Sequence, residues 1–151
     1  MTTASPPSQP IPDEKTAYAR ADEHIGEAIV ALADPVRLEP GIRNSIGFDA
    51  GAMGSELLCN VEVSYTLEDL RDDEMPSARN ERYFGLLKEF WAQRGYVLAS
   101  DTADGEDPRP PWFRAVHVEH PADHCHVSLK QGRLGNLWIT ASLVAYTGEP
   151  E

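Results

Sequence analysis

The sequence predicts an α+β protein in which an antiparallel sheet of five to six strands has two amphipathic helices packed on one face. Apolar residues recur at three- and four-residue steps in two segments, which indicates two helices. In several other segments they recur at every second residue, which indicates strands. The chain of 151 residues is 41% hydrophobic, which is enough for one domain to bury a core of its own.

Short tails flank the predicted domain. Residues 1–12 are rich in proline, serine and threonine and carry little apolar surface, so we expect a disordered tail there. A single α+β domain is expected over residues 13–147, and residues 148–151 form a second tail.

The first helix is expected over residues 13–34, with Asp13 as its N-cap and Pro35 ending it. The glycine- and proline-rich segment that follows predicts only a short strand, over residues 42–48. The apolar stripe of the helix consists of Tyr18, Ala21, Ile25, Ala28, Ile29 and Leu32.

A strand and a second helix are predicted in the middle of the chain. Apolar and polar residues alternate over residues 57–67, which predicts a half-buried strand with Cys59 facing the core. The acidic run at residues 68–74 predicts an exposed loop. Ser77 is expected to cap the next helix, and Gly95 to end it in a left-handed conformation. The apolar stripe of this helix consists of Tyr83, Phe84, Leu87, Phe90 and Trp91.

The C-terminal third of the chain is expected to form the rest of the sheet. A short strand is predicted at residues 96–100 and a loop at residues 101–111. Residues 112–147 then predict three antiparallel strands. The turn His-Pro-Ala-Asp-His favours the register that sets Val118 opposite Val127.

This register divides the polar residues of the hairpin between two faces. Glu119 faces His126 on the solvated side, where His117 faces Ser128. His120 and Cys125 lie on the core side near the turn.

Two surfaces are predicted to bind a partner. The last strand is apolar on both sides, which is typical of a strand that is central or covered on both faces, so its outward side chains are candidate interface residues. The acidic loop after the first long strand is a second candidate, for a basic partner. The predicted binding residues are Trp138, Val144, Tyr146, Asp72, Asp73 and Glu74.

The charge and composition of the chain exclude several classes of partner. A net charge of −12 argues against binding nucleic-acid phosphates or an anionic membrane surface. The chain contains no apolar run of the roughly 18 residues that a spanning helix requires. Its glycine-rich segment lacks the lysine of a phosphate-binding loop, and we expect no cofactor. A homodimer is left open.

The histidines between residues 117 and 126 support an alternative prediction, a metal site. His117, Glu119 and His126 share one face of adjacent strands and His124 lies in the turn, so these four side chains could ligate a transition metal. Their spacing matches no known metal motif, and cross-strand pairing of surface His and Glu explains it equally well.

The two cysteines are predicted to be structural. Cys125 faces the core beside His120, which makes it a poor nucleophile, and no catalytic residue is predicted. If their strands are neighbours, Cys59 and Cys125 would form a disulfide in an oxidising compartment or remain two buried thiols in the cytosol. As written, the chain is expected in the cytoplasm; a tether removed from its N-terminus would place it outside.

From Phe90 onward the chain carries Phe-Trp-x-x-x-Gly-Tyr, an acidic proline-rich loop, a polar turn with proline and aspartate, Val-Ser-Leu and Gly-x-Leu-x-Ile-x-Ala-Ser. This pattern resembles small actinobacterial domains, usually membrane-tethered or lipoprotein-like and of unknown function. The resemblance implies the α+β fold and an extracytoplasmic setting, and it implies no activity. Family members end the last strand in Ser-Pro-Cys, where this chain has Ser142, Leu143 and Val144, so a disulfide from Cys59 to that strand is not available.

The sequence therefore favours a non-enzymatic protein-binding module, of the immunity, inhibitor or accessory type, without identifying its partner. A metal-binding protein or metal-dependent enzyme is the first alternative. An acidic mimic of nucleic acid is the second, although the acids cluster in loops rather than in a regular row.

Overall fold

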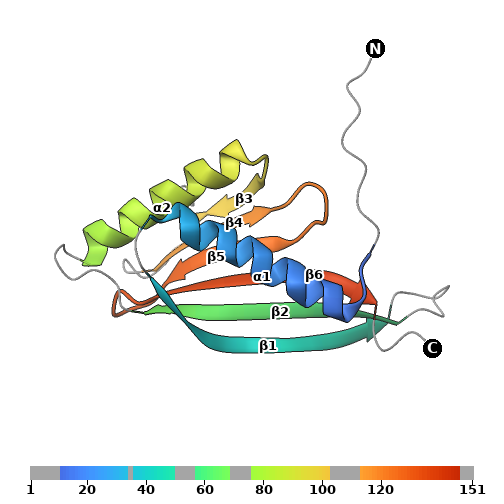
Figure 1. The fold of residues 1–151 in the computed structure, drawn as a ribbon. Helices are drawn as coiled ribbons and strands as arrows, with labels where there is room; N and C mark the ends of the chain where they lie inside the picture. Colours follow the sequence, from blue (N-terminus) through green and yellow to red (C-terminus); the bar gives the residue numbers. More distant parts are fainter. Residues whose placement is uncertain (1–10, 34–35, 50–56, 69–75, 103–112, 147–151) are drawn as a thin grey trace, which may run out of the picture.

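The computed structural model describes residues 11–33, 36–49, 57–68, 76–102 and 113–146. Two helices lie on the same face of a six-stranded antiparallel sheet, as Figure 1 shows and as the sequence predicts. We call this the covered face, and the opposite side the open face. The strand order is β1-β2-β6-β5-β4-β3. The elements in chain order are α1 (Glu14–Ala31), β1 (Arg37–Asp49), β2 (Leu57–Glu68), α2 (Pro76–Gln93), β3 (Val97–Asp101), β4 (Arg114–Glu119), β5 (His126–Gln131) and β6 (Leu137–Tyr146).

The predicted cap of α1 is confirmed, because the Asp13 carboxylate accepts the backbone N–H of Thr16 at 2.8 Å. The helix ends at Ala31, three residues before the predicted end at residue 34. Ala33 has a φ of 61°, the left-handed conformation that commonly ends a helix.

α2 begins at Pro76, one residue before the predicted cap Ser77. Proline suits the first turn of a helix because its fixed φ is already helical and its missing N–H is not needed there. The predicted helix end is confirmed, since Gly95 has a φ of 86°.

The largest difference from the sequence prediction is β1, a strand of 13 residues where only residues 42–48 were expected. It is an edge strand, and its pairing with β2 shifts between Pro40 and Arg43, which indicates a bulge. Proline is tolerated at the edge of a sheet because its missing N–H breaks no inner ladder. Asp101, placed in a loop by the sequence, instead ends β3.

The predicted register of the β4–β5 hairpin is confirmed in three pairs: Val118 opposite Val127, Glu119 opposite His126, and His117 opposite Ser128.

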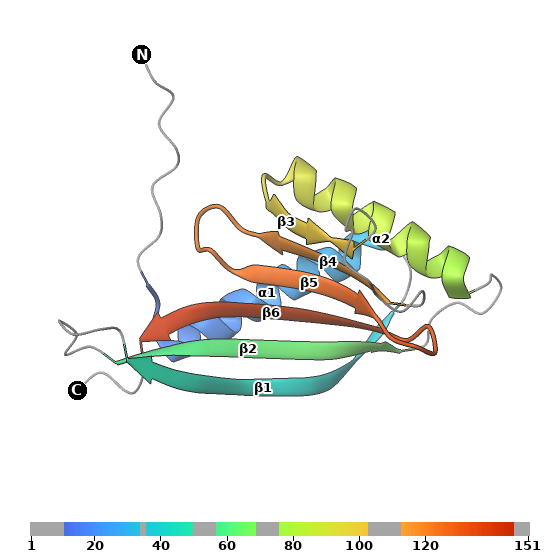
Figure 2. The same ribbon diagram turned by 180° about the vertical axis from the view of Figure 1, so that it is seen from behind.

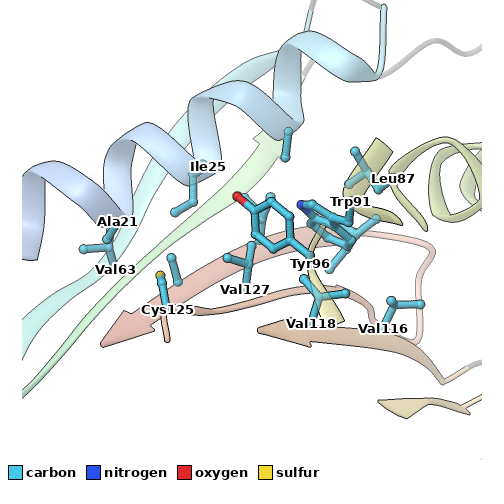
Figure 3. Close-up of a cluster of buried hydrophobic side chains, with 14 of the residues drawn as sticks. Ala21, Ile25, Val63, Leu87, Trp91, Tyr96, Val116, Val118, Cys125 and Val127 are labelled. Atoms are coloured by element: carbon cyan, nitrogen blue, oxygen red, sulfur yellow. The ribbon is translucent and has the colours of Figure 1, made fainter. Parts of the chain in front are cut away.

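The core lies between the sheet and the two helices. α1 packs on β2 and β6, and α2 packs on β3 and β4. In Figure 3, Tyr96 lies between Ile25 of α1 and Trp91 of α2, above Val127 of the sheet.

The two cysteines are both buried on the core side, as predicted. β6 separates β2, which carries Cys59, from β5, which follows Cys125, and no disulfide joins these two described residues. Within the described ranges, neither helix is long and apolar enough to cross a membrane.

Figure 2 views the molecule from the side of the open face, with α1 behind the strands.

Candidate functional site

A cluster of polar side chains lies on the covered side of the sheet, where three segments meet. α1 contributes His24, the link between α2 and β3 contributes Tyr96, and the turn between β4 and β5 contributes His120 and Asp123. The side chains of His24 and Asp123 are only 8% and 5% exposed. Such a buried group must be hydrogen-bonded, because leaving it unpaired costs more than most single contacts contribute.

His24 is held at both ring nitrogens. Its Nε2 lies 2.8 Å from Asp123 Oδ2, and its Nδ1 lies 2.6 Å from the hydroxyl of Tyr96. An ionised carboxylate only accepts hydrogen bonds, so a neutral His24 donates from Nε2 and accepts the Tyr96 hydroxyl proton at Nδ1. The second carboxylate oxygen of Asp123 accepts the backbone N–H of Cys125 at 2.9 Å. The three side chains therefore form one continuous chain of hydrogen bonds.

His120 packs against this chain. Its ring centroid is 4.8 Å from that of His24 and 5.0 Å from that of Tyr96. Its Nδ1 accepts the backbone N–H of Ala122 at 3.2 Å and lies 3.3 Å from Asp123 Oδ1. The ring is 24% exposed, so it forms the outer side of the cluster.

Burial and hydrogen bonding shift the pKa values of this cluster. Burial lowers the pKa of His120, which favours the neutral imidazole. Burial opposes ionisation of Asp123 too, but hydrogen bonds from His24 and from the backbone of Cys125 outweigh it, so the pKa of Asp123 falls below 3.8. Burial raises the pKa values of Tyr96 and Cys125, and both therefore stay protonated at neutral pH. The site thus offers a neutral imidazole at His120 and a carboxylate at Asp123, and no thiolate nucleophile at Cys125.

A cleft of about 350 Å³ adjoins the cluster. The pairing of β5 with β6 ends at His126, which lies opposite Ser142. The remaining residues of β6, from Leu143 to Tyr146, continue past the turn that joins β4 to β5. Farther along, the N–H of Tyr146 donates to the carbonyl of Pro12 at 2.8 Å. The cleft lies between these two attachments and is lined by Ile11, Pro12, Asn60, Asp123, His124, His126, Leu143 and Val144.

The structure places the predicted binding residues at different points. Val144 and Tyr146 lie together at the end of β6, each 38% exposed. Trp138 is half-buried at the other end of that strand, opposite Thr66 and Lys130. The acidic residues predicted to bind a partner, Asp72, Asp73 and Glu74, lie outside the described residues.

The predicted metal ligands are only partly brought together. Glu119 lies opposite His126 and its carboxylate is 2.8 Å from Nδ1 of His124. His117 lies two positions farther along β4, opposite Ser128. Metal binding by these four side chains stays a prediction.

The structure assembles a different group. In the part of the chain that it describes, one group of three His, Cys, Asp or Glu side chains has its ligand atoms within 4.8 Å of one another, and that group is His24, His120 and Asp123.

Sequence reasoning missed His24, although its position carried a signal. It lies three residues after Ala21 and four before Ala28, so it belongs to the buried stripe of α1. A histidine on a buried stripe needs a polar partner, which this spacing alone does not identify.

Comparisons of the chain with known protein families, with curated proteins and with solved structures found no match.

Proposed function

We propose that the protein is a non-enzymatic binding protein that recognises a second protein through the open face of its sheet. The observation that carries this proposal is a group of exposed apolar side chains on that face. Ile46 is 61% exposed, and Val144 and Tyr146 are each 38% exposed. Exposed apolar side chains that are contiguous, unlike scattered ones, mark interaction surfaces.

The strand register supports treating these residues as one patch. Ile46 of β1 and Val144 of β6 lie on either side of Asn60 of β2. In the next row, Leu58 and Tyr146 lie directly opposite each other, with Cβ atoms about 5 Å apart. Leu58 is also the diagonal neighbour of both Ile46 and Val144, at about 7–8 Å, so the four apolar side chains form one group around Asn60. We call Ile46, Leu58, Val144 and Tyr146 the open patch.

The surroundings of the open patch favour a basic partner. The neighbouring row on the same face carries Glu62, Ser142, His126 and Glu119 in successive strands. The whole chain has a net charge of −12. An apolar centre beside an acidic rim is the arrangement that steers a basic protein and then excludes water at the contact.

Charge insertion tests this proposal. Ile46→Asp and Val144→Asp each place a carboxylate in the open patch at a site already open to solvent, so the fold should persist. Val30→Asp is the matched control, because Val30 is 79% exposed and lies on α1, behind the sheet. The tagged wild type and variants would be compared for capture of proteins from host extract at low and high salt.

We expect a partner that binds the wild type and Val30→Asp but is lost with both open-patch variants. Capture that is equal for all four proteins would contradict the proposal, as would the absence of any partner at both salt concentrations. Sedimentation of the purified wild type detects self-association, in which case the partner is a second copy of the chain.

A further inference from the structure

We propose that His24, His120 and Asp123 bind a divalent transition-metal ion of the zinc type. The three ligand atoms lie within 4.8 Å of one another, and each residue comes from a part of the fold held in place by packing or hydrogen bonds. The three ligands lie on the covered side of the sheet and none of them belongs to the open patch, although Asp123 and Val144 line the same cleft. The proposal does not rest on partner binding.

The ligand set suits zinc. Two imidazole nitrogens and one carboxylate oxygen are donors that zinc accepts at about 2.0–2.2 Å. In a tetrahedral site such bonds place neighbouring donor atoms about 3.3 Å apart. His24 Nε2 and Asp123 Oδ2 are 2.8 Å apart, so binding requires them to separate by a few tenths of an ångström. The metal ion would replace the hydrogen bond that now joins them.

The proton on His24 can be accommodated without leaving the ring. A metal ion on Nε2 requires the lone pair there, so the proton moves to Nδ1 and the imidazole stays neutral. Nδ1–H would then donate to the oxygen of the Tyr96 hydroxyl, which is 2.6 Å away. The hydroxyl would rotate so that its own proton points away from His24. The Tyr96 hydroxyl can serve either tautomer because it both donates and accepts.

Partners outside the ligand set already orient two of the three ligands. Tyr96 fixes the ring of His24, and the backbone N–H of Cys125 holds Asp123 Oδ1, which leaves Oδ2 for the ion. Metal-ligating histidines and carboxylates are usually fixed in this way by a second layer of hydrogen bonds.

The cleft offers a route to the site. Asp123 lines the cleft as well as the cluster, and His120 is 24% exposed. Three protein ligands leave the fourth position of a tetrahedral ion for water or for a group of a bound molecule.

The first experiment titrates zinc or cobalt into untagged, metal-stripped protein. We expect one ion per chain by calorimetry, visible absorption typical of tetrahedral cobalt, and a melting temperature that rises with metal concentration. At a free metal concentration 100 times the dissociation constant, the folding equilibrium constant should rise about 100-fold.

Variants locate the ion. His120→Ala should weaken binding about 100-fold or more, since it removes a ligand, and Tyr96→Phe should weaken it about 10- to 100-fold by releasing His24. His117→Ala is the matched control, because His117 lies on the open face opposite Ser128, and it should leave the affinity unchanged.

Should His120→Ala fail to fold, Asp123→Asn takes its place, since its amide oxygen can still accept the N–H of Cys125. The absence of one-to-one binding by the folded wild type would overturn the proposal. So would affinity lost on replacing His117 but kept on replacing His120, because the ion would then lie on the open face.

Discussion

The two faces of the sheet use the same strands for opposite purposes. Along β6, the side chains of Leu137, Ile139, Ala141, Leu143 and Ala145 are at most 2% exposed. Their immediate neighbours on the strand point the other way, and Val144 and Tyr146 are each 38% exposed. Alternation sets which residues share a face, but the helices decide which face becomes core. An apolar residue on β6 can therefore be assigned to the core or to the surface only when the elements that pack on its face of the sheet are known.

The faces also treat charge differently. On the covered side, the Asp101 carboxylate is fully buried and paired with both Lys88 and Arg114. On the open side, Glu119 and His124 pair with their side chains 37% and 54% exposed. A buried charge without partners is costly, whereas a solvated pair contributes little. Substitutions on the two faces should therefore differ sharply in their effect on stability.

The largest expected effect follows from truncating the covered side of β6. Ile139→Ala should reduce the free energy of unfolding by about 4 kcal/mol, because it removes buried methylene groups and leaves a cavity. Val144→Thr, on the same strand, should change it by less than about 0.5 kcal/mol. Urea unfolding followed by circular dichroism measures both. Equal losses would show that the open face is covered in solution.

The next effect concerns the buried charge. Asp101→Asn should cost about 3 kcal/mol, since it leaves Lys88 and Arg114 facing a neutral group. Glu39→Gln is the control, because Glu39 pairs with Arg37 while both side chains are more than half exposed, at 54% and 57%. It should leave the unfolding midpoint unchanged. A control loss as large as that of Asp101→Asn would remove the distinction between buried and solvated pairs.

A smaller effect is expected where α2 is tied to the β5–β6 turn. The Asn80 side chain is fully buried and donates to Gln131 Oε1 at 2.9 Å and to the carbonyl of Gly135 at 2.8 Å. Asn80→Ala should cost about 2 kcal/mol, because it removes both of these hydrogen bonds and the bond that Asn80 Oδ1 accepts from Arg79 Nε. Gln93→Ala, which removes an exposed bond to Glu89, is the control. Thermal melting of both variants measures the two losses. A loss of stability in Gln93→Ala but not in Asn80→Ala would contradict the stabilising role of the Asn80 hydrogen bonds.

The smallest effect lies at the start of α1. A hydrogen bond from the backbone of Thr16 lowers the pKa of Asp13 below 3.8. The stabilising contribution of this carboxylate is therefore fully present above pH 3.8 and is lost as the pH falls through the lower pKa of the folded state. Asp13→Asn should slightly reduce the fall of the melting temperature that the wild type shows as the pH is lowered into the acid range. An unchanged fall would show that the cap does not titrate with folding.

Local features of the fold were predictable because they depend on neighbouring residues. The side-chain period of two assigned β2 and β6, and the hairpin turn assigned the pairing of Val118 with Val127. β1 was mostly missed, since its glycine and proline content is typical of loops and only the edge position in the sheet makes it tolerable.

The candidate site was less predictable than the fold. The sequence drew attention to the histidines between residues 117 and 126, because they are close along the chain. Of these, only His120 belongs to the three-residue group that the structure brings together. His24 and Tyr96 had no local feature that linked them to that turn.

By itself, the sequence determined the two helices, the strands from β2 onward, the register of the β4–β5 hairpin and the acidity of the surface, since spacing, caps and turns act over a few residues. Only the tertiary structure decided which face of the sheet stays open and which polar groups meet. His24 contacts Tyr96 across 72 positions of sequence and Asp123 across 99. Such contacts form because α1 packs over β2 and β6 beside the β4–β5 turn, and that packing depends on the whole core at once.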